Sequence, residues 1–164
     1  MTVKISAPDC PICEAQDWVN GSHQVELSHH NESLTVSDLV HSECAECGYE
    51  LILPHQTRRN DARIRDARRD ASGLLTSARI KAIRRKLGVS QQHMAALIGC
   101  GKNSFSKYER GEVTQSAAMD KLLRILDASP EAFEILEKQQ TPQASRKFIY
   151  ESDAPPSSVL TEGR

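Results

Sequence analysis

The sequence predicts an α+β protein with a small β-rich N-terminal domain, a linker helix and an all-α domain of five helices. Three observations support this. Two Cys-x-x-Cys pairs lie within the first 47 residues, the charge changes sign along the chain, and capped amphipathic helices follow one another towards residue 140. At 164 residues, the chain has room for one medium domain or two small ones. We predict units at 1–55, 56–73 and 74–140, and a disordered tail at 141–164.

Four of the five cysteines form two matched pairs, Cys10 with Cys13 and Cys44 with Cys47, with 30 residues between the pairs. Each pair turns the backbone so that both sulfur atoms face one ion, and two pairs complete the tetrahedral set that Zn²⁺ prefers. The sequence shows neither a long apolar run nor a signal-peptide pattern, so we expect a cytoplasmic protein, in which thiols stay reduced. We therefore predict one structural zinc ion per chain and interpret Cys100 as a small turn residue.

The segment between the cysteine pairs is predicted to form short strands, at residues 18–19, 25–27, 34–36 and 39–41. The expected breaks are Asn20-Gly21-Ser22 and His29-His30-Asn31. Large apolar residues are too few to build an independent core in about 50 residues. The zinc ion would supply the missing stabilisation, and its removal should unfold the domain.

Charge divides the chain into three blocks. Residues 1–55 carry one Lys and nine acids, a net charge of −8, whereas residues 56–111 carry 14 Lys and Arg against four acids, a net charge of +10. Residues 112–164 carry six bases and nine acids, a net charge of −3. The middle block favours a polyanion as partner and the first favours a basic surface. The alternative is that the two blocks attract each other.

Residues 56–73 are rich in Arg, Asp and Ala and have only a weak apolar stripe, which indicates a solvated linker helix. Its arginines either contact phosphates or only keep the helix soluble. Five helices are expected after it, each with a capping or turn signal. They begin near Thr76 or Ser77, Ser90, Lys102 or Asn103, Ser116 and Ser129.

The second and third of these helices, with Gly99-Cys100-Gly101 between them, form a helix-turn-helix pattern. The third helix would lie in the major groove with its polar face outward. Asn can bond adenine through two atoms, and Lys can reach guanine. Gln91 starts the preceding helix, where it can contact phosphate and brace the third helix. The predicted DNA-binding residues are Asn103, Lys107, Lys102, Ser106 and Gln91; the alternative is that Gln91 and Lys102 are ordinary exposed residues.

Residues 89–111, VSQQHMAALIGCGKNSFSKYERG, resemble the Xre/lambda-repressor-like DNA-binding fold. Together with the two cysteine pairs and the leucine-rich segment 121–127, they resemble more narrowly the MqsA-type antitoxins over residues 10–137. This resemblance implies a zinc module at Cys10, Cys13, Cys44 and Cys47 and a lambda-repressor-like C-terminal domain. Family members read bases with an Asn and a basic residue, which match Asn103 and Lys107; the basic residue is typically Arg, so Lys107 departs from the pattern.

The resemblance also implies partners. It predicts a homodimer joined through the C-terminal domain, a palindromic operator in double-stranded DNA, and a toxin that cleaves mRNA and binds the zinc module. A ribonuclease of this kind is expected to be basic, which suits the acidic first block. The sequence contains no motif between the cysteine pairs that specifies this toxin.

Other functions fit the sequence less well. An enzyme could use the histidines as bases, but four thiolates leave no open position on zinc, and no nucleophile lies at a recognisable spacing from a base. A redox role would favour a single Cys-x-x-Cys near a βαβ pattern. Two alternatives stay open. One histidine could replace a cysteine as metal ligand, and the protein could be a stand-alone transcription regulator without a toxin. The five N-terminal histidines are His23, His29, His30, His41 and His55.

Overall fold

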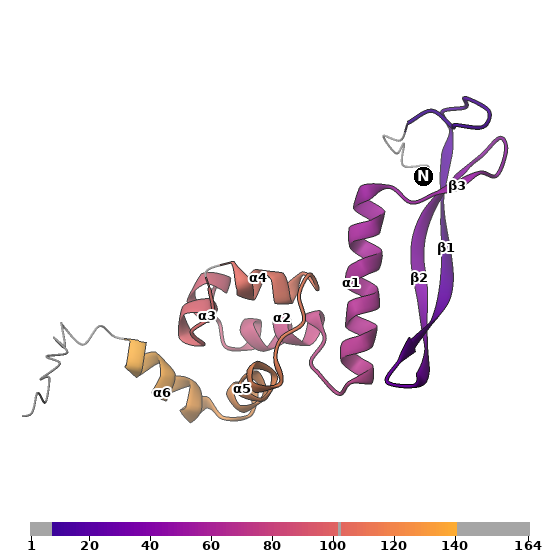
Figure 1. Cartoon of the computed structure of the whole chain (residues 1–164). Coiled ribbons are helices and arrows are strands. Elements are labelled where there is room, and N and C mark those ends of the chain that lie inside the picture. The colour runs from indigo at the N-terminus through magenta and orange to yellow at the C-terminus, as the bar shows by residue number, and fades with distance from the viewer. Residues whose placement is uncertain (1–7, 102, 141–164) are drawn as a thin grey trace, which may run out of the picture.

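A long β-hairpin, a single helix beside it and five further helices make up the protein, as seen in a computed structural model that describes residues 8–101 and 103–140. Figure 1 shows the helix α1 (Pro54–Ala71) standing between the hairpin and the five helices. The predicted α+β class is confirmed. Lys102 and the predicted disordered tail lie outside the described residues.

The hairpin consists of β1 (Trp18–His29) and β2 (Glu32–Cys44), with the short β3 (Glu50–Leu51) beside β2. All pairs are antiparallel, and the β1–β2 register shifts between His23 and Val25. The turn places His30 and Asn31 at positive φ, at 48° and 65°, as tight hairpin turns require. The predicted turn at His29-His30-Asn31 is therefore confirmed.

The prediction of a break at Asn20-Gly21-Ser22 is wrong, because all three residues lie inside β1. Gly21 pairs with His41 across the hairpin, and a Cβ atom at Gly21 would lie 2.2 Å from Nε2 of that imidazole. Glycine thus gives the buried His41 ring room and does not end the strand. The two strands, of 12 and 13 residues, are at least four times as long as the predicted segments of two or three residues.

Helix α1 covers β2, where Val36 and Leu39 are each 3% exposed. Asn60 bonds both backbone groups of Val40: the Val40 amide donates to Oδ1, and Nδ2 donates to the Val40 carbonyl, each at 2.8 Å. Gln56 accepts from the Leu53 amide at 2.8 Å and donates to Ser42 Oγ at 2.9 Å. The prediction of a solvated helix is therefore wrong for one face, since these contacts anchor polar side chains on the hairpin.

The five remaining helices are α2 (Ser77–Lys86), α3 (Gln91–Leu97), α4 (Ser104–Glu109), α5 (Ala117–Ala128) and α6 (Pro130–Gln140). The predicted N-caps Thr76, Ser90 and Ser116 each accept a hydrogen bond from the backbone amide three residues later. The fully buried side chains of their shared core are Ile80, Ile83, Met94, Ala95, Phe105, Leu123 and Leu126. Among the described residues, no helix is long and apolar enough to cross a membrane.

The Asn60 contact gives a testable prediction. Asn60→Ala should lower the free energy of unfolding by about 1–3 kcal/mol, because the amide and carbonyl of Val40 lose their partner under α1. Arg59→Ala, at the adjacent exposed position, is the matched control. Denaturant titration followed by circular dichroism would compare the variants, and equal stability of the two would contradict the anchoring role.

Candidate metal centre and nucleic-acid interface

The four predicted cysteine ligands come together at the end of the hairpin. Their sulfur atoms all lie within 4.8 Å of one another. The Sγ atoms of Cys10 and Cys47 are 3.6 Å apart, and those of Cys13 and Cys44 are 3.5 Å apart. Tetrahedral zinc with Zn–S bonds of about 2.3 Å requires sulfur atoms about 3.8 Å apart. The cluster therefore fits a tetrahedral metal ion, and no histidine belongs to it among the described residues.

The two Cys-x-x-Cys pairs have the same backbone conformation. Cys10 and Cys44 each accept, through the carbonyl, from the amide four residues on, in Glu14 and Gly48, at 2.9 Å. Each also donates its own amide to the carbonyl five residues on, at 2.9 Å. Glu14 and Gly48 both take positive φ, at 60° and 72°. The chain thus repeats one ligand-bearing turn, and the hairpin brings its two copies face to face.

The electrostatics of the cluster favour a dication. Burial opposes ionisation of Cys10, but backbone amides of Ile12 and Cys13 together with the Cys47 thiol stabilise its thiolate and lower its pKa to about 7. The Ala15 amide favours the Cys13 thiolate, yet desolvation and the three neighbouring sulfur atoms outweigh it and raise the pKa to about 12. The Cys10 thiolate therefore forms readily, and its negative charge opposes ionisation of the neighbouring thiols. A bound divalent ion removes this repulsion.

Few apolar side chains support the cluster. Cys10 and Cys44 are each 1% exposed and lie against Trp18, which is 6% exposed and donates from Nε1 to the Pro8 carbonyl at 3.0 Å. Cys13 and Cys47 face solvent. One aromatic ring and two sulfur atoms are a very small core, so the expected stabilisation by metal agrees with the structure.

The predicted DNA-binding residues mostly lie on or beside α4. Asn103 precedes its first residue, and both Asn103 and Lys107 are exposed, one helical turn apart. Ser106 is half-buried and donates its hydroxyl hydrogen to the Asn103 carbonyl at 2.9 Å. Asn103 and Lys107 are therefore free to face a ligand, whereas Ser106 fixes the first turn of the helix.

Gln91 lies apart from these residues, in a network that the sequence reasoning missed. Its Nε2 donates to Glu109 Oε2 at 2.5 Å, and Arg84 donates to both oxygens of the same carboxylate, at 2.5 and 3.2 Å. Glu109 is only 9% exposed. These bonds tie α2, α3 and α4 together and agree with the predicted bracing by Gln91. A single acid, Glu109, among many bases in segment 74–111 was the available signal.

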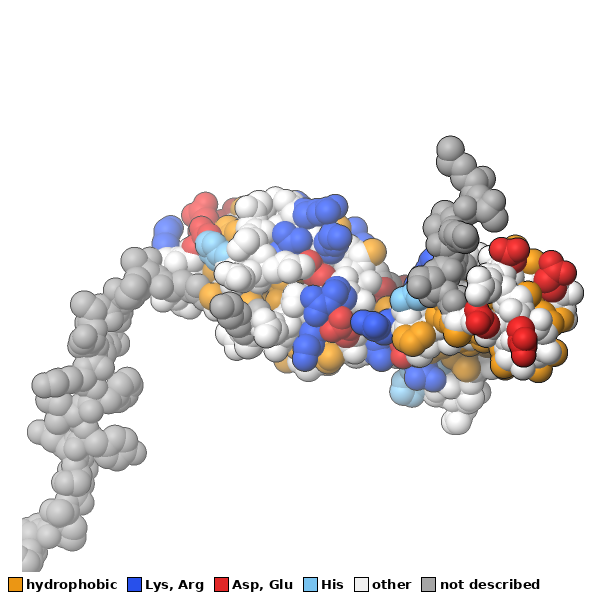
Figure 2. All heavy atoms as spheres, turned by 90° about the horizontal axis from the view of Figure 1, so that it is seen from above, with side chains coloured by type: hydrophobic (Ala, Val, Ile, Leu, Met, Phe, Trp, Pro, Cys, Tyr) orange, Lys and Arg blue, Asp and Glu red, His pale blue; other side chains and the backbone are white. Residues whose placement is uncertain are grey.

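A basic groove borders the C-terminal end of α4. Its volume is about 540 Å³, and four arginines line it together with Ala62 and the acids Asp61 and Glu112. Figure 2, which looks onto the α4 side of the molecule, shows Lys and Arg side chains grouped near its middle and acidic side chains at the metal-binding end. The arginines come from α1 and from the residue after α4: Arg58, Arg59, Arg65 and Arg110.

Comparison with known proteins places the chain in a family. A family model described as "Antitoxin component of bacterial toxin-antitoxin system, MqsA" matches residues 8–137. The chain belongs to the MqsA antitoxin family. The Antitoxin MqsA of Escherichia coli (strain K12) is 24% identical over 123 residues, which cover 74% of this chain and 94% of that protein. The predicted resemblance to MqsA-type antitoxins is confirmed, and the match spans both the cysteine cluster and the helices.

The metal centre yields a second prediction. Removing the metal with a strong chelator, or replacing one ligand by Cys44→Ser, should unfold the N-terminal module, because thiolate–metal bonds substitute for its missing core. Cys100→Ser, outside the cluster, is the matched control. Near-ultraviolet circular dichroism of Trp18 and metal content would be measured together. An unchanged Trp18 signal after confirmed metal loss would show that the metal is not structural.

Proposed function

We propose that this MqsA-family antitoxin is a zinc-stabilised, homodimeric repressor that binds the operator of its own operon through α4 and its toxin through the N-terminal module. The exposed pair of Asn103, which precedes α4, and Lys107, one turn further along the helix, is the observation that carries the DNA-binding part. The family membership carries the toxin part. We refer to α4 below as the reading helix.

We expect the reading helix to enter a DNA major groove as part of a rigid three-helix unit. Glu109, Arg84 and Gln91 hold α2, α3 and α4 in one unit. Asn103 can bond adenine N6 and N7, and Lys107 can donate to guanine O6 or N7 from the next turn. Lys supplies a point charge where the family pattern has an Arg fork, so we expect a different base preference at that position. Lys102 and Gln91 would add phosphate contacts beside the bases.

The arginine groove extends this surface along the DNA backbone. Arg58 and Arg59 are exposed on α1, and Arg110 is exposed at the end of the reading helix. A duplex lying on the reading helix would bring a phosphate strand past this groove. The excess of positive charge in residues 56–111 supports the same partner, because phosphate neutralisation supplies most of the non-specific affinity for DNA.

We infer that two chains pair through the five-helix domain, as the family resemblance implies. Ile125 on α5 and Ile135 on α6 are 53% and 56% exposed, on the last two helices of the domain. Apolar side chains of this size are suited to a subunit interface. In the dimer, two reading helices about 34 Å apart would meet successive major grooves of a palindrome.

The N-terminal module is proposed to bind a basic toxin of the mRNA-cleaving ribonuclease type. Residues 1–55 carry a net charge of −8; Ile12, inside the first ligand pair, and Tyr49, two residues after the second, are 67% and 39% exposed. Exposed apolar side chains in an acidic module are suited to a basic protein surface with an apolar centre. With four thiolates on the ion, the metal has no open position for a substrate, so we propose no catalytic role for it.

Base reading gives a direct test. Asn103→Ala should weaken binding to the operator by about 1–3 kcal/mol and relax the preference at one base pair, because a two-point contact to adenine is lost. Lys121→Ala, an exposed change on α5, is the control. Fluorescence anisotropy with the chain's own promoter would measure both affinities. If Asn103→Ala binds the operator with the parental affinity and base preference, the reading helix does not lie in the major groove.

The arginine groove predicts a different behaviour. The double variant Arg58→Ala, Arg59→Ala should weaken binding about equally for all DNA sequences and reduce the slope of log K against log salt by about 2, or about 1 for each lost phosphate contact. Titrations at several salt concentrations would measure the slope. If the double variant has the same salt slope as the parent, these arginines only keep α1 soluble and do not contact phosphates.

Co-purification tests the proposed antitoxin role itself. The tagged chain, expressed with its neighbouring genes, should retain a small basic protein, and Cys44→Ser should release it. A dimer that binds its promoter and retains no such protein would instead favour a stand-alone regulator.

A further inference from the structure

Two arginines of α1 donate hydrogen bonds to backbone carbonyls at the C-terminal end of the reading helix and in the loop after it. Arg69 is 1% exposed and donates from its guanidinium to the carbonyls of Tyr108, at 3.4 and 3.5 Å, and of Val113. Arg65 donates to the carbonyl of Gly111. Because α4 ends at Glu109, these carbonyls belong to its last turn and to the loop that follows. Helix ends leave such carbonyls unsatisfied and carry partial negative charge, which a guanidinium neutralises.

The backbones meet closely at the same place. Gly111 has a φ of 69°, and a Cβ atom there would lie 3.1 Å from the Cβ of Ala62 on α1. A small residue on each side therefore lets α1 lie directly against the loop. Both arginines then reach the carbonyls from the next turns of α1.

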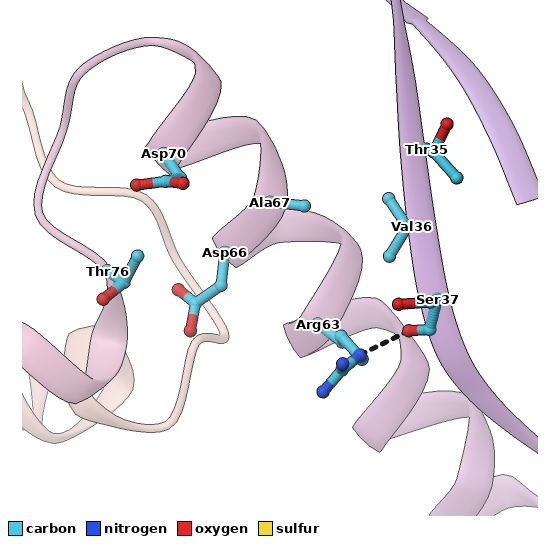
Figure 3. A pocket seen from close by; sticks show the side chains of 8 residues that line it. All are labelled: Thr35, Val36, Ser37, Arg63, Asp66, Ala67, Asp70 and Thr76. Carbon is cyan, nitrogen blue, oxygen red and sulfur yellow. Dashed lines mark hydrogen bonds between the residues drawn. The ribbon is translucent and has the colours of Figure 1, made fainter. Parts of the chain in front are cut away.

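A carboxylate on α1 completes the contact with the helical domain. Asp66 accepts from Arg69 at 2.6 Å, from the Ser77 amide at 2.9 Å and from the Ser77 hydroxyl. Ser77 is the first residue of α2. Figure 3 shows the pocket that α1 lines at this level: Asp66 and Asp70 turn towards Thr76, whereas Arg63 points to Ser37 on β2.

The opposite face of α1 is fixed to the hairpin. Besides the Asn60 and Gln56 contacts, Arg63 donates to the Ser37 carbonyl and to Asp38, each at 2.5 Å. At the hairpin turn, His29 Nε2 lies 2.7 Å from the Ser72 hydroxyl. One helix thus contacts the metal-bearing module along one side, and the end of the reading helix with its following loop on the other.

We propose that Arg65 and Arg69, the arginine clamp, are positioning residues for DNA binding that hold the N-terminal module at one fixed orientation to the reading helix. A planar guanidinium with five donors suits several carbonyls at once, which a lysine or a neutral side chain does not. The clamp sets where Arg58 and Arg59 lie relative to Asn103 and Lys107. The fixed orientation is argued from the contacts above. Its effect on DNA binding rests on the proposed function.

The orientation is measurable without DNA. Spin labels attached to unnatural residues at the exposed positions Gln24 and Lys121 would report the distance between the hairpin and α5 in the zinc-loaded full chain, diluted with unlabelled protein. The parent should give one narrow distribution, and Arg69→Met should give a broad one. Arg68→Met removes an exposed arginine from the same helix and should leave the distribution narrow. A broad distance distribution in the parent, or a narrow one in Arg69→Met, would show that the arginine clamp does not fix the orientation.

A second variant covers the event that Arg69→Met does not fold, as judged by zinc content and thermal unfolding. Ala62→Met places a larger apolar side chain against Gly111 and should also broaden the distribution, whereas Ala71→Met, at the exposed end of α1, should not. A narrow distribution in Ala62→Met would overturn the clamp by itself.

Binding to the chain's own promoter gives the functional readout. Arg69→Met should lower affinity about tenfold without changing the salt slope, because a buried arginine releases no counterion while a loosened module must be ordered on binding. A reduced salt slope would make Arg69 a phosphate contact and overturn the positioning role. If the parent itself does not bind the promoter, the proposed function fails, and the distance measurement still decides the clamp.

Discussion

Four sulfur atoms converging within 4.8 Å of one another determine how the N-terminal module folds. The strands around them bury little apolar surface, and Trp18 is the one large side chain in the buried cluster with Cys10 and Cys44. Bringing two ligand turns together across 30 residues costs chain entropy, which a few apolar contacts cannot offset. A tetrahedral ion offsets this cost through four thiolate bonds. We therefore expect the hairpin, and with it the position of α1, to depend on the metal.

Helix α1 connects the metal-binding module to the side of the molecule that we propose binds DNA. Its amides Gln56 and Asn60 bond β2, and its guanidinium groups Arg65 and Arg69 bond the end of the reading helix. The two functional regions thus share one helix. Their opposite charges follow the same division: acids surround the metal-binding end, and arginines line the groove beside the reading helix. Such a layout would keep the proposed basic toxin and the proposed DNA at different ends of one small molecule.

Local sequence patterns were enough to predict the features that depend on near neighbours. The Cys-x-x-Cys spacing, the caps at Thr76, Ser90 and Ser116, and the glycine turn before the reading helix each involve residues within a few positions of one another. The MqsA-type resemblance added the order in which these pieces occur, and the family match confirms it.

The features that were missed depend on contacts between distant residues. Gly21 continues a strand because His41, 20 positions away, occupies the space above it. Arg69 looks like one more exposed base in a charged helix, and its burial becomes evident only from Tyr108 and Val113. Helical periodicity assigns charged residues to the solvent-exposed face. It holds no information about distant carbonyl groups, such as those of Tyr108 and Val113, that need a hydrogen-bond donor.

Zinc-edge X-ray absorption on the purified full chain tests the central claim most directly, because it reports the atoms bound to the metal. We predict one zinc ion per chain with four sulfur ligands at about 2.3 Å. Cys44→Ser should reduce the sulfur count or abolish binding. A site with nitrogen or oxygen ligands in the native chain, or a folded chain without stoichiometric metal, would contradict the account.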